Sequence, residues 1–165
     1  PILLQCDITE RETKAIAEKI LDLAGDNQFR LSDFAVLCPT VQQCNSVKIK
    51  FDQLGIPCIL REDEQFDILE DRIKVLTIHS AKGLEFPVVF IIGLHNGILP
   101  NPIKFIDDEE AEIALERERT LLYVAMTRSA EALYLVSSKE NPSSFINEII
   151  KLLKIETYTG GKQNE

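Results

Sequence analysis

Short, unbroken apolar segments alternate with longer amphipathic segments along this chain, and that alternation limits its fold more than any other feature. The clearest apolar segment is 88–92, in which all five residues are hydrophobic. A strand without polar positions is buried on both faces, as the strands of a parallel sheet are. Because helices of ten or more residues separate such strands, we expect an α/β domain whose mainly parallel sheet is covered by helices on both faces.

Hydrophobic spacing and helix-boundary residues place the individual elements. The expected strands are residues 33–38, 58–60, 73–76, 87–92 and 133–136. The expected helices are 9–25, 40–54, 111–126 and one that begins at Asn141 and Pro142. T-x-x-E and T-x-x-Q patterns at Thr9 and Thr40 predict capping boxes for the first two helices. We expect one domain over residues 1–158 and a polar, flexible tail over 159–165.

The net charge argues against a domain that holds nucleic acid by bulk charge alone. The chain has 18 Lys and Arg against 27 Asp and Glu, a net charge of -9. Segments 62–71 and 107–118 carry a net charge of -6 each, which leaves +3 for the rest of the chain. We therefore expect no strong, autonomous DNA binding, although the acidity lies outside the loop at 77–83.

Several other classes of protein are excluded by spacing. The four cysteines form no C-x-x-C pair and the two histidines form no metal-binding pattern, so no metal site is predicted. No apolar run reaches the roughly 18 residues that a membrane span needs, and the N-terminus lacks a signal-peptide pattern. We expect an intracellular, cytoplasmic protein that does not associate with a membrane.

The segment from Thr77 to Glu85, TIHSAKGLE, carries groups suited to chemistry between two strands. The hydroxyls of Thr77 and Ser80, the His79 imidazole and backbone N–H groups near Gly83 are donors of the kind that hold phosphates, and Lys82 adds a positive charge. A purely structural alternative remains open, in which Thr77 and Ser80 cap a helical turn and the charged residues face water.

A second segment, from Glu116 to Arg128, predicts a helix that ends near the rim of the sheet. Its apolar residues pack inward, and Arg128 follows just before the expected strand at 133–136. An arginine in this place can reach the γ-phosphate of a nucleotide held by another domain. It can equally stabilise the helix C-terminus without any function, and both interpretations stay open here.

The segment from Ile73 to Gly93, IKVLTIHSAKGLEFPVVFIIG, closely resembles motif V of the UvrD/Rep-like superfamily 1 DNA helicases. The segment from Glu116 to Ala130 resembles their motif VI. The two long motifs occur in the family's order, and the resemblance extends from about Ile2 to Val136. It implies the C-terminal RecA-like (P-loop NTPase-like) domain of such a helicase, in agreement with the α/β fold expected from the residues.

The resemblance also implies roles for individual residues. Arg128 is expected to be a catalytic arginine finger for the γ-phosphate of ATP, with Tyr123 packed beneath it, and Glu85 is expected to bind the ribose. Gly83 allows close backbone approach at the nucleotide site. The expected contacts to single-stranded DNA are Thr77, His79, Ser80 and Lys82.

A phosphate-binding loop is missing from the chain, since no G-x-x-x-x-G-K-[ST] sequence occurs. We therefore expect ATP and Mg to be bound mainly by an N-terminal RecA-like domain, and the isolated chain to be inactive. Asp107–Glu110 is better interpreted as an acidic helix start than as a metal-binding box.

The sequence departs from the family in two places. Near Cys38 and Pro39, where many relatives carry an aromatic residue and an arginine, it has neither, and Arg61 and Arg72 are the available substitutes. Only a short acidic segment, 61–72, stands where relatives often insert a large accessory domain. The leading hypothesis is a helicase or translocase motor domain. The alternatives are a non-catalytic module that binds nucleic acid or protein, and a motor that remodels protein–nucleic acid complexes without unwinding.

Overall fold

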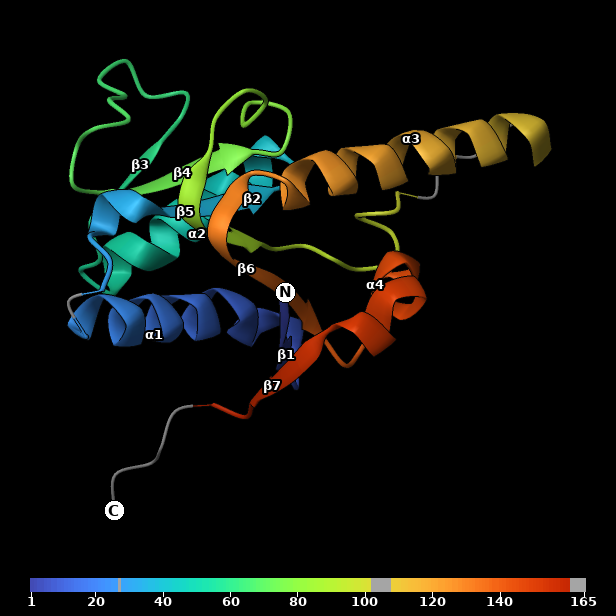
Figure 1. Cartoon of the computed structure of the whole chain (residues 1–165), viewed down its shortest axis with the longest axis horizontal. Coiled ribbons are helices and arrows are strands. Elements are labelled where there is room, and N and C mark those ends of the chain that lie inside the picture. Colours follow the sequence, from blue (N-terminus) through green and yellow to red (C-terminus); the bar gives the residue numbers. More distant parts are fainter. Residues whose placement is uncertain (27, 102–107, 161–165) are drawn as a thin grey trace.

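In a computed structural model of the chain, the seven strands of the described residues lie parallel in one sheet (Figure 1). The structure describes residues 1–26, 28–101 and 108–160. The strand order is β3-β4-β2-β5-β6-β1-β7. The strands are β1 (Ile2–Cys6), β2 (Phe34–Cys38), β3 (Cys58–Leu60), β4 (Ile73–Thr77), β5 (Phe86–Ile91), β6 (Ser129–Ser138) and β7 (Lys154–Tyr158).

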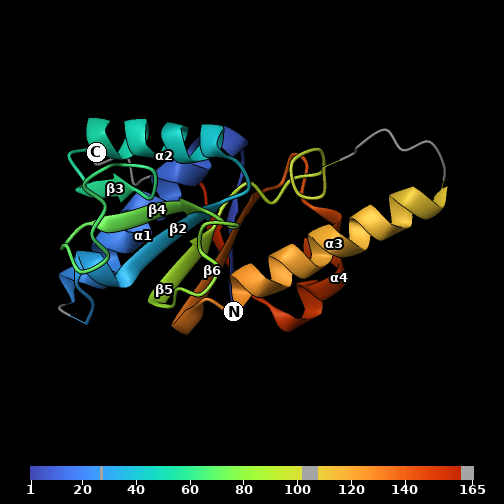
Figure 2. The same ribbon diagram turned by 90° about the horizontal axis from the view of Figure 1, so that it is seen from above.

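Helices cover both faces of the sheet, as predicted. The helices are α1 (Glu12–Gly25), α2 (Val41–Gln53), α3 (Asp108–Met126) and α4 (Ser144–Ile149). Buried residues of α1 and α2 join one hydrophobic cluster, and those of α3 and α4 join a second cluster on the other face. Figure 2 shows α1 and α2 together, well separated from α3 and α4. The α/β prediction is therefore confirmed, with a sheet that is wholly rather than mainly parallel.

Of the three helix starts predicted from capping residues, one agrees with the structure. Thr40 caps α2, since the Gln43 N–H donates to Thr40 Oγ1 at 3.2 Å. The capping box at Thr9 is wrong: Thr9 begins a short 3-10 turn, Thr9–Arg11, and α1 begins only at Glu12. The last helix is capped by Ser143 instead of Asn141, because the Phe145 N–H donates to Ser143 Oγ at 3.2 Å.

Two strands were not predicted from the sequence. β1 lies inside the sheet between β6 and β7, and β7 forms the outer edge. β6 is also longer than the predicted 133–136, since it already pairs with β5 at Ser129. The predicted tail, 159–165, falls mostly on residues 161–165, which lie outside the described residues.

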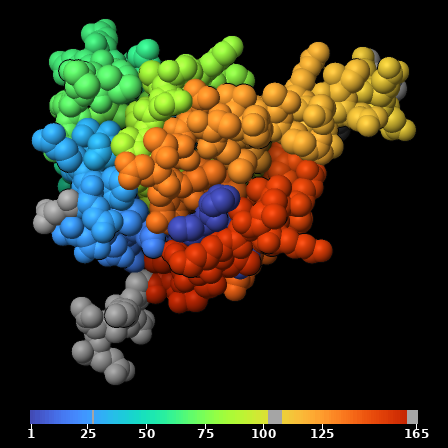
Figure 3. Space-filling view, viewed as in Figure 1, coloured from blue at the N-terminus to red at the C-terminus, as the bar shows by residue number. Residues whose placement is uncertain are grey.

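Helix α3 extends beyond the sheet. Of its 19 residues, only Leu122 and Ala125 are buried, and both belong to its last two turns. Its N-terminal half protrudes from the body of the molecule in Figures 1 and 3. Within the described part of the chain, no helix is both long enough and apolar enough to cross a membrane.

Candidate nucleotide and nucleic-acid site

The loop from Thr77 to Glu85 begins with a helical turn that lies against the sheet. Thr77 Oγ1 accepts a hydrogen bond from the Ser80 N–H at 3.0 Å, and the two hydroxyl oxygens lie 2.7 Å apart. The Ala81 N–H donates to the Thr77 carbonyl at 3.1 Å. Thr77 therefore caps the turn, as the structural alternative held. The predicted DNA contacts of Thr77 and Ser80 stay predictions.

The turn has an apolar side and a basic side. Ile78 and Ala81 are buried in the cluster beneath α3, and Leu84 packs against the same cluster. His79 and Lys82 are exposed. In a tight helical turn, residues three apart lie on the same face. Because Ile78 and Ala81 share the packed face, His79 and Lys82 share the face in solvent.

Gly83 ends the turn in a conformation that favours glycine. Its φ is +84°, and no heavy atom lies within 4 Å of the position that a Cβ would occupy. The backbone therefore requires glycine for its positive φ, while the space beside it stays open to an approaching group. The assignment of Gly83 to the nucleotide site stays a prediction.

Arg128 joins the end of α3 to the loop. Its Nε donates to the Val124 carbonyl at 3.1 Å, Nη2 donates to Thr127 Oγ1 at 3.0 Å, and Nη1 donates to the Leu84 carbonyl at 3.3 Å. The Phe86 N–H donates in turn to the Arg128 carbonyl at 2.9 Å. A guanidinium has five N–H donors, so these bonds fix the half-buried side chain and leave two donors for another acceptor.

The predicted site residues fall at two opposite edges of the sheet. Thr77 is the last residue of β4, whereas Glu85 and Arg128 immediately precede β5 and β6. The pairing registers of β2 with β4 and β5 place these two ends roughly 20 Å apart along the strands. The loop residues lie at both ends of the strands, because a connection between parallel strands must return from the carboxyl edge to the amino edge.

A groove of about 470 Å³ lies between the exposed side of the loop and α3. The loop contributes Ile78, His79 and Lys82 to its walls. The remaining lining residues come from α3 and are Arg117, Glu118, Thr120, Leu121 and Val124. The structure thus brings two of the predicted DNA contacts, His79 and Lys82, to one groove, together with an arginine to which the sequence analysis assigned no role.

Comparison with known proteins identifies the family. Residues 59–140 match the profile of the UvrD-like helicase C-terminal domain. The ATP-dependent DNA helicase PcrA of Bacillus subtilis is 34% identical over 139 residues, which cover 81% of this chain and 18% of the relative. PcrA of Leuconostoc citreum is 36% identical over 119 residues, 66% of this chain and 15% of the relative. The chain belongs to the UvrD-like helicase C-terminal domain family.

Solved structures agree on the fold of this UvrD-like domain. The C-terminal domain of a possible DNA helicase from Lactobacillus plantarum WCFS1 superposes with a TM-score of 0.70, 18% identity and coverage of 94% of this chain and 84% of that one. The C-terminal domain of the DEAD-box protein Dbp5 gives a TM-score of 0.62, 11% identity and coverage of 94% and 87%. The RecA-like fold is therefore confirmed. The chain spans less than a fifth of the length of the PcrA relatives.

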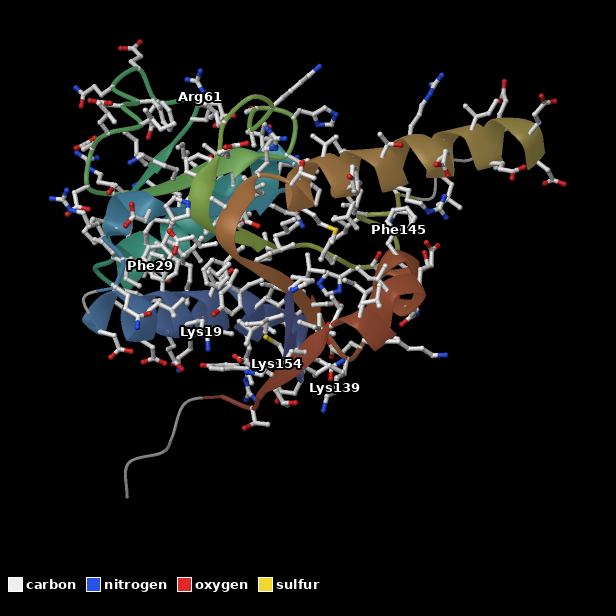
Figure 4. All side chains as sticks on the ribbon, viewed as in Figure 1. Lys19, Phe29, Arg61, Lys139, Phe145 and Lys154 are labelled. Atoms are coloured by element: carbon white, nitrogen blue, oxygen red, sulfur yellow. The ribbon has the colours of Figure 1, made fainter. Side chains whose placement is uncertain are left out.

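Helix α3 of this UvrD-like domain, which carries motif VI, is held on α4 by Arg119. The Arg119 guanidinium bonds Glu148 at 3.1 and 3.0 Å and lies 5.3 Å from the centre of the Phe145 ring. The carboxylates of Glu148 and Glu116 raise the pKa of Arg119 above its ordinary value. Figure 4 places Phe145 between the two helices. Tyr123, which was expected beneath Arg128, is instead 66% exposed.

Cys38 and Pro39 stand where the family resemblance predicts an aromatic residue and an arginine. Cys38 is buried at the end of β2, and contact with the Cys44 thiol together with burial raises its pKa. The two candidate substitutes are held by their own loop, because Arg61 lies 4.7 Å over the Phe66 ring and Arg72 pairs with Glu70 at 2.6 Å. These contacts give no support for either residue as the substitute for the missing arginine.

A buried ion pair was missed from the sequence. Glu12 Oε1 lies 2.7 Å from His95 Nε2, and the two side chains are only 3% and 5% exposed. The T-x-x-E pattern predicts that Glu12 belongs to a capping box, and no sequence pattern assigns a role to His95. The signal available was an acid on the apolar side of the first helix, between Ile8 and Ile16.

The described residues contain no group of three or more His, Cys, Asp or Glu that could hold a metal ion. Asp107 lies outside the described residues. Asp108, Glu109 and Glu110 occupy the first turn of α3, where acidic side chains stabilise the positive end of the helix dipole.

Proposed function

We propose that this chain is the C-terminal motor domain of an ATP-dependent DNA helicase or translocase. An N-terminal RecA-like domain completes its ATP site and holds most of the ATP and Mg. The chain contributes one RecA-like domain, residues 1–158, and acts in the cytoplasm. The family match and the PcrA relatives, whose names describe ATP-dependent DNA helicases, support this proposal.

The observation that carries the proposal is the bond between Arg128 and the carbonyl of Leu84, at 3.3 Å. It ties the motif VI arginine to the motif V loop directly beside Glu85. Two guanidinium donors remain for phosphate oxygens, and the Glu85 carboxylate, which is exposed, is suited to accept hydrogen bonds from ribose hydroxyls. Charge-assisted bonds from a fixed guanidinium would stabilise the charge that develops on the γ-phosphate during its transfer.

The motif V loop would connect this nucleotide edge to DNA. Glu85 stands at one end of the loop, and His79 and Lys82 stand on its turn, with the buried residues Ile78 and Ala81 holding that turn against the sheet. A displacement of the loop at the nucleotide edge would therefore move the turn as a unit. Closing and opening of the two RecA-like domains over ATP would in this way shift the bound strand.

The proposal is tested by Arg128→Ala in a protein that joins this chain to its N-terminal RecA-like domain. DNA-stimulated ATP turnover should fall by about a thousandfold or more, while nucleotide binding stays nearly unchanged, because the finger acts on the transition state. Lys151→Ala, which removes an exposed charge far from motif VI in the sequence, is the control. Unchanged turnover of the Arg128 variant would refute the finger assignment.

A second function is favoured by one observation, the absence of a cation at Cys38. A chain that lacks this phosphate-binding side chain suits a module that keeps the fold and binds nucleic acid without hydrolysing ATP. The same measurement separates the two, since a non-catalytic module gives no DNA-stimulated turnover even without a substitution.

A further inference from the structure

The groove between the motif V loop and α3 carries three basic side chains on its walls. His79 and Lys82 come from the loop, and Arg117 comes from α3. Within the described part of the chain, none of the three takes part in an ion pair. By contrast, Arg119, two residues from Arg117, is bonded to two carboxylates.

The geometry of α3 explains why two neighbouring arginines behave so differently. Residues two apart on a helix point about 200° apart, so Arg117 faces away from α4 when Arg119 faces toward it. The pairing of Arg119 with Glu148 at 3.0 Å therefore fixes the rotation of α3 that turns Arg117 to the groove.

One acid shares the groove, but its carboxylate is already engaged. Glu118 Oε2 accepts a hydrogen bond from the Asn101 N–H at 2.7 Å. No acid of the described residues forms an ion pair with Arg117 or Lys82. In a chain with a net charge of -9, two full positive charges therefore remain available at one groove. Unpaired cations that converge on one groove favour an anionic ligand.

The remaining walls fit a polynucleotide strand better than a small anion. Ile78, Leu121 and Val124 line the groove with aliphatic side chains, next to the hydroxyl of Thr120. Aliphatic surface accommodates sugars, whereas base stacking uses aromatic side chains, so contacts here fall on the sugar–phosphate backbone.

We propose that Arg117 binds a phosphate of single-stranded DNA and thereby extends the DNA track from the motif V loop onto α3. This inference rests on the proposed function, because it takes the ligand of that loop to be DNA. It adds a contact from motif VI, so that the same helix carries Arg117 for DNA and ends next to Arg128 for the nucleotide.

The test measures binding of the 165-residue chain to fluorescein-labelled oligo(dT) by anisotropy, from 20 to 100 mM KCl. Arg117→Gln should weaken binding by about two- to five-fold, as expected for one exposed ionic contact. It should also reduce the slope of log affinity against log salt by about 0.7, the value for one phosphate on a single strand.

The matched control is Lys139→Gln, which removes an exposed charge on the opposite side of the molecule from the loop (Figure 4). Among the described residues, no acid forms an ion pair with Lys139. It should leave both the affinity and the slope unchanged. Lys82→Gln should behave like Arg117→Gln.

The outcomes separate the two proposals. If Lys82→Gln reduces the slope and Arg117→Gln does not, the DNA track stops at the loop and the inference about Arg117 is wrong, while the proposed function stands. An acidic protein surface as the partner of Arg117 would give this same result. If the unsubstituted chain shows no salt-dependent binding at all, the DNA assignment of the whole groove is contradicted.

Discussion

At the scale of single residues, two buried ionisable side chains pair away from the candidate site. Glu12 and His95 pair at 2.7 Å between the start of α1 and the segment after β5, and His95 Nδ1 lies 3.2 Å from the Asn141 carbonyl. Burial raises the pKa of the Glu12 carboxyl. Burial alone would lower the pKa of His95, but the Glu12 carboxylate outweighs it and raises that pKa. The pair therefore links α1, the segment after β5 and the segment at Asn141, and the strength of this link depends on pH.

We predict that the domain loses stability as the pH rises above 6.5, the ordinary pKa of histidine. The folded protein binds the imidazole proton more tightly than the unfolded chain, so the contribution is complete below pH 6.5 and is lost as the pH passes the raised pKa. The steepest slope that one proton gives is about 1.4 kcal/mol per pH unit. Urea unfolding from pH 6 to 9 measures it.

Glu12→Gln should flatten this pH profile, because it removes the charge that raises the pKa of His95. Glu10→Gln, which removes an exposed neighbouring charge, should keep the profile of the unsubstituted chain. Identical profiles for the Glu12 variant and the unsubstituted chain would show that the pair does not set the pH dependence.

At the scale of elements, the sequence predicts the strands that are continuous buried runs, and it misses two strands that are recognised only by their backbone pairing. β2 and β5 are continuous apolar runs, and β4 is buried at every position, including Lys74. The predicted bounds of all three strands lie within one residue of the observed ones. β7 is an edge strand in which no residue is buried, so its backbone pairing with β1, and not side-chain burial, stabilises it. β1 has five residues, ILLQC, of which Gln5 is polar, and it is too short for its periodicity to separate strand from helix.

Helix α3 should show uneven local stability, since its buried residues lie only in its last two turns. Its N-terminal half, residues 108–116, has few apolar contacts to lose on opening. In hydrogen exchange, amides of residues 122–126 should exchange at least about tenfold more slowly than those of residues 112–116. Uniform protection along the helix would contradict this description of its packing.

At the scale of the whole molecule, the sequence predicted the fold and the identity of the motifs, and the structure added their arrangement. The sequence could not place Glu85 and Arg128 at the edge opposite Thr77, because that depends on the path of the loop across the sheet. It also gave Arg117 no role, although Arg117, Leu121 and Val124 follow the i, i+4, i+7 spacing of one helical stripe. Under the proposed function, the loop would transmit a change at the nucleotide edge to DNA at the opposite edge.

The central claim, that this chain is half of an ATP-driven motor, is tested most directly by steady-state ATP hydrolysis with single-stranded DNA present. The 165-residue chain should hydrolyse no ATP above background, because its sequence contains no phosphate-binding loop. The same chain joined to its N-terminal RecA-like domain should show DNA-dependent turnover. Robust hydrolysis by the 165-residue chain alone would contradict the account.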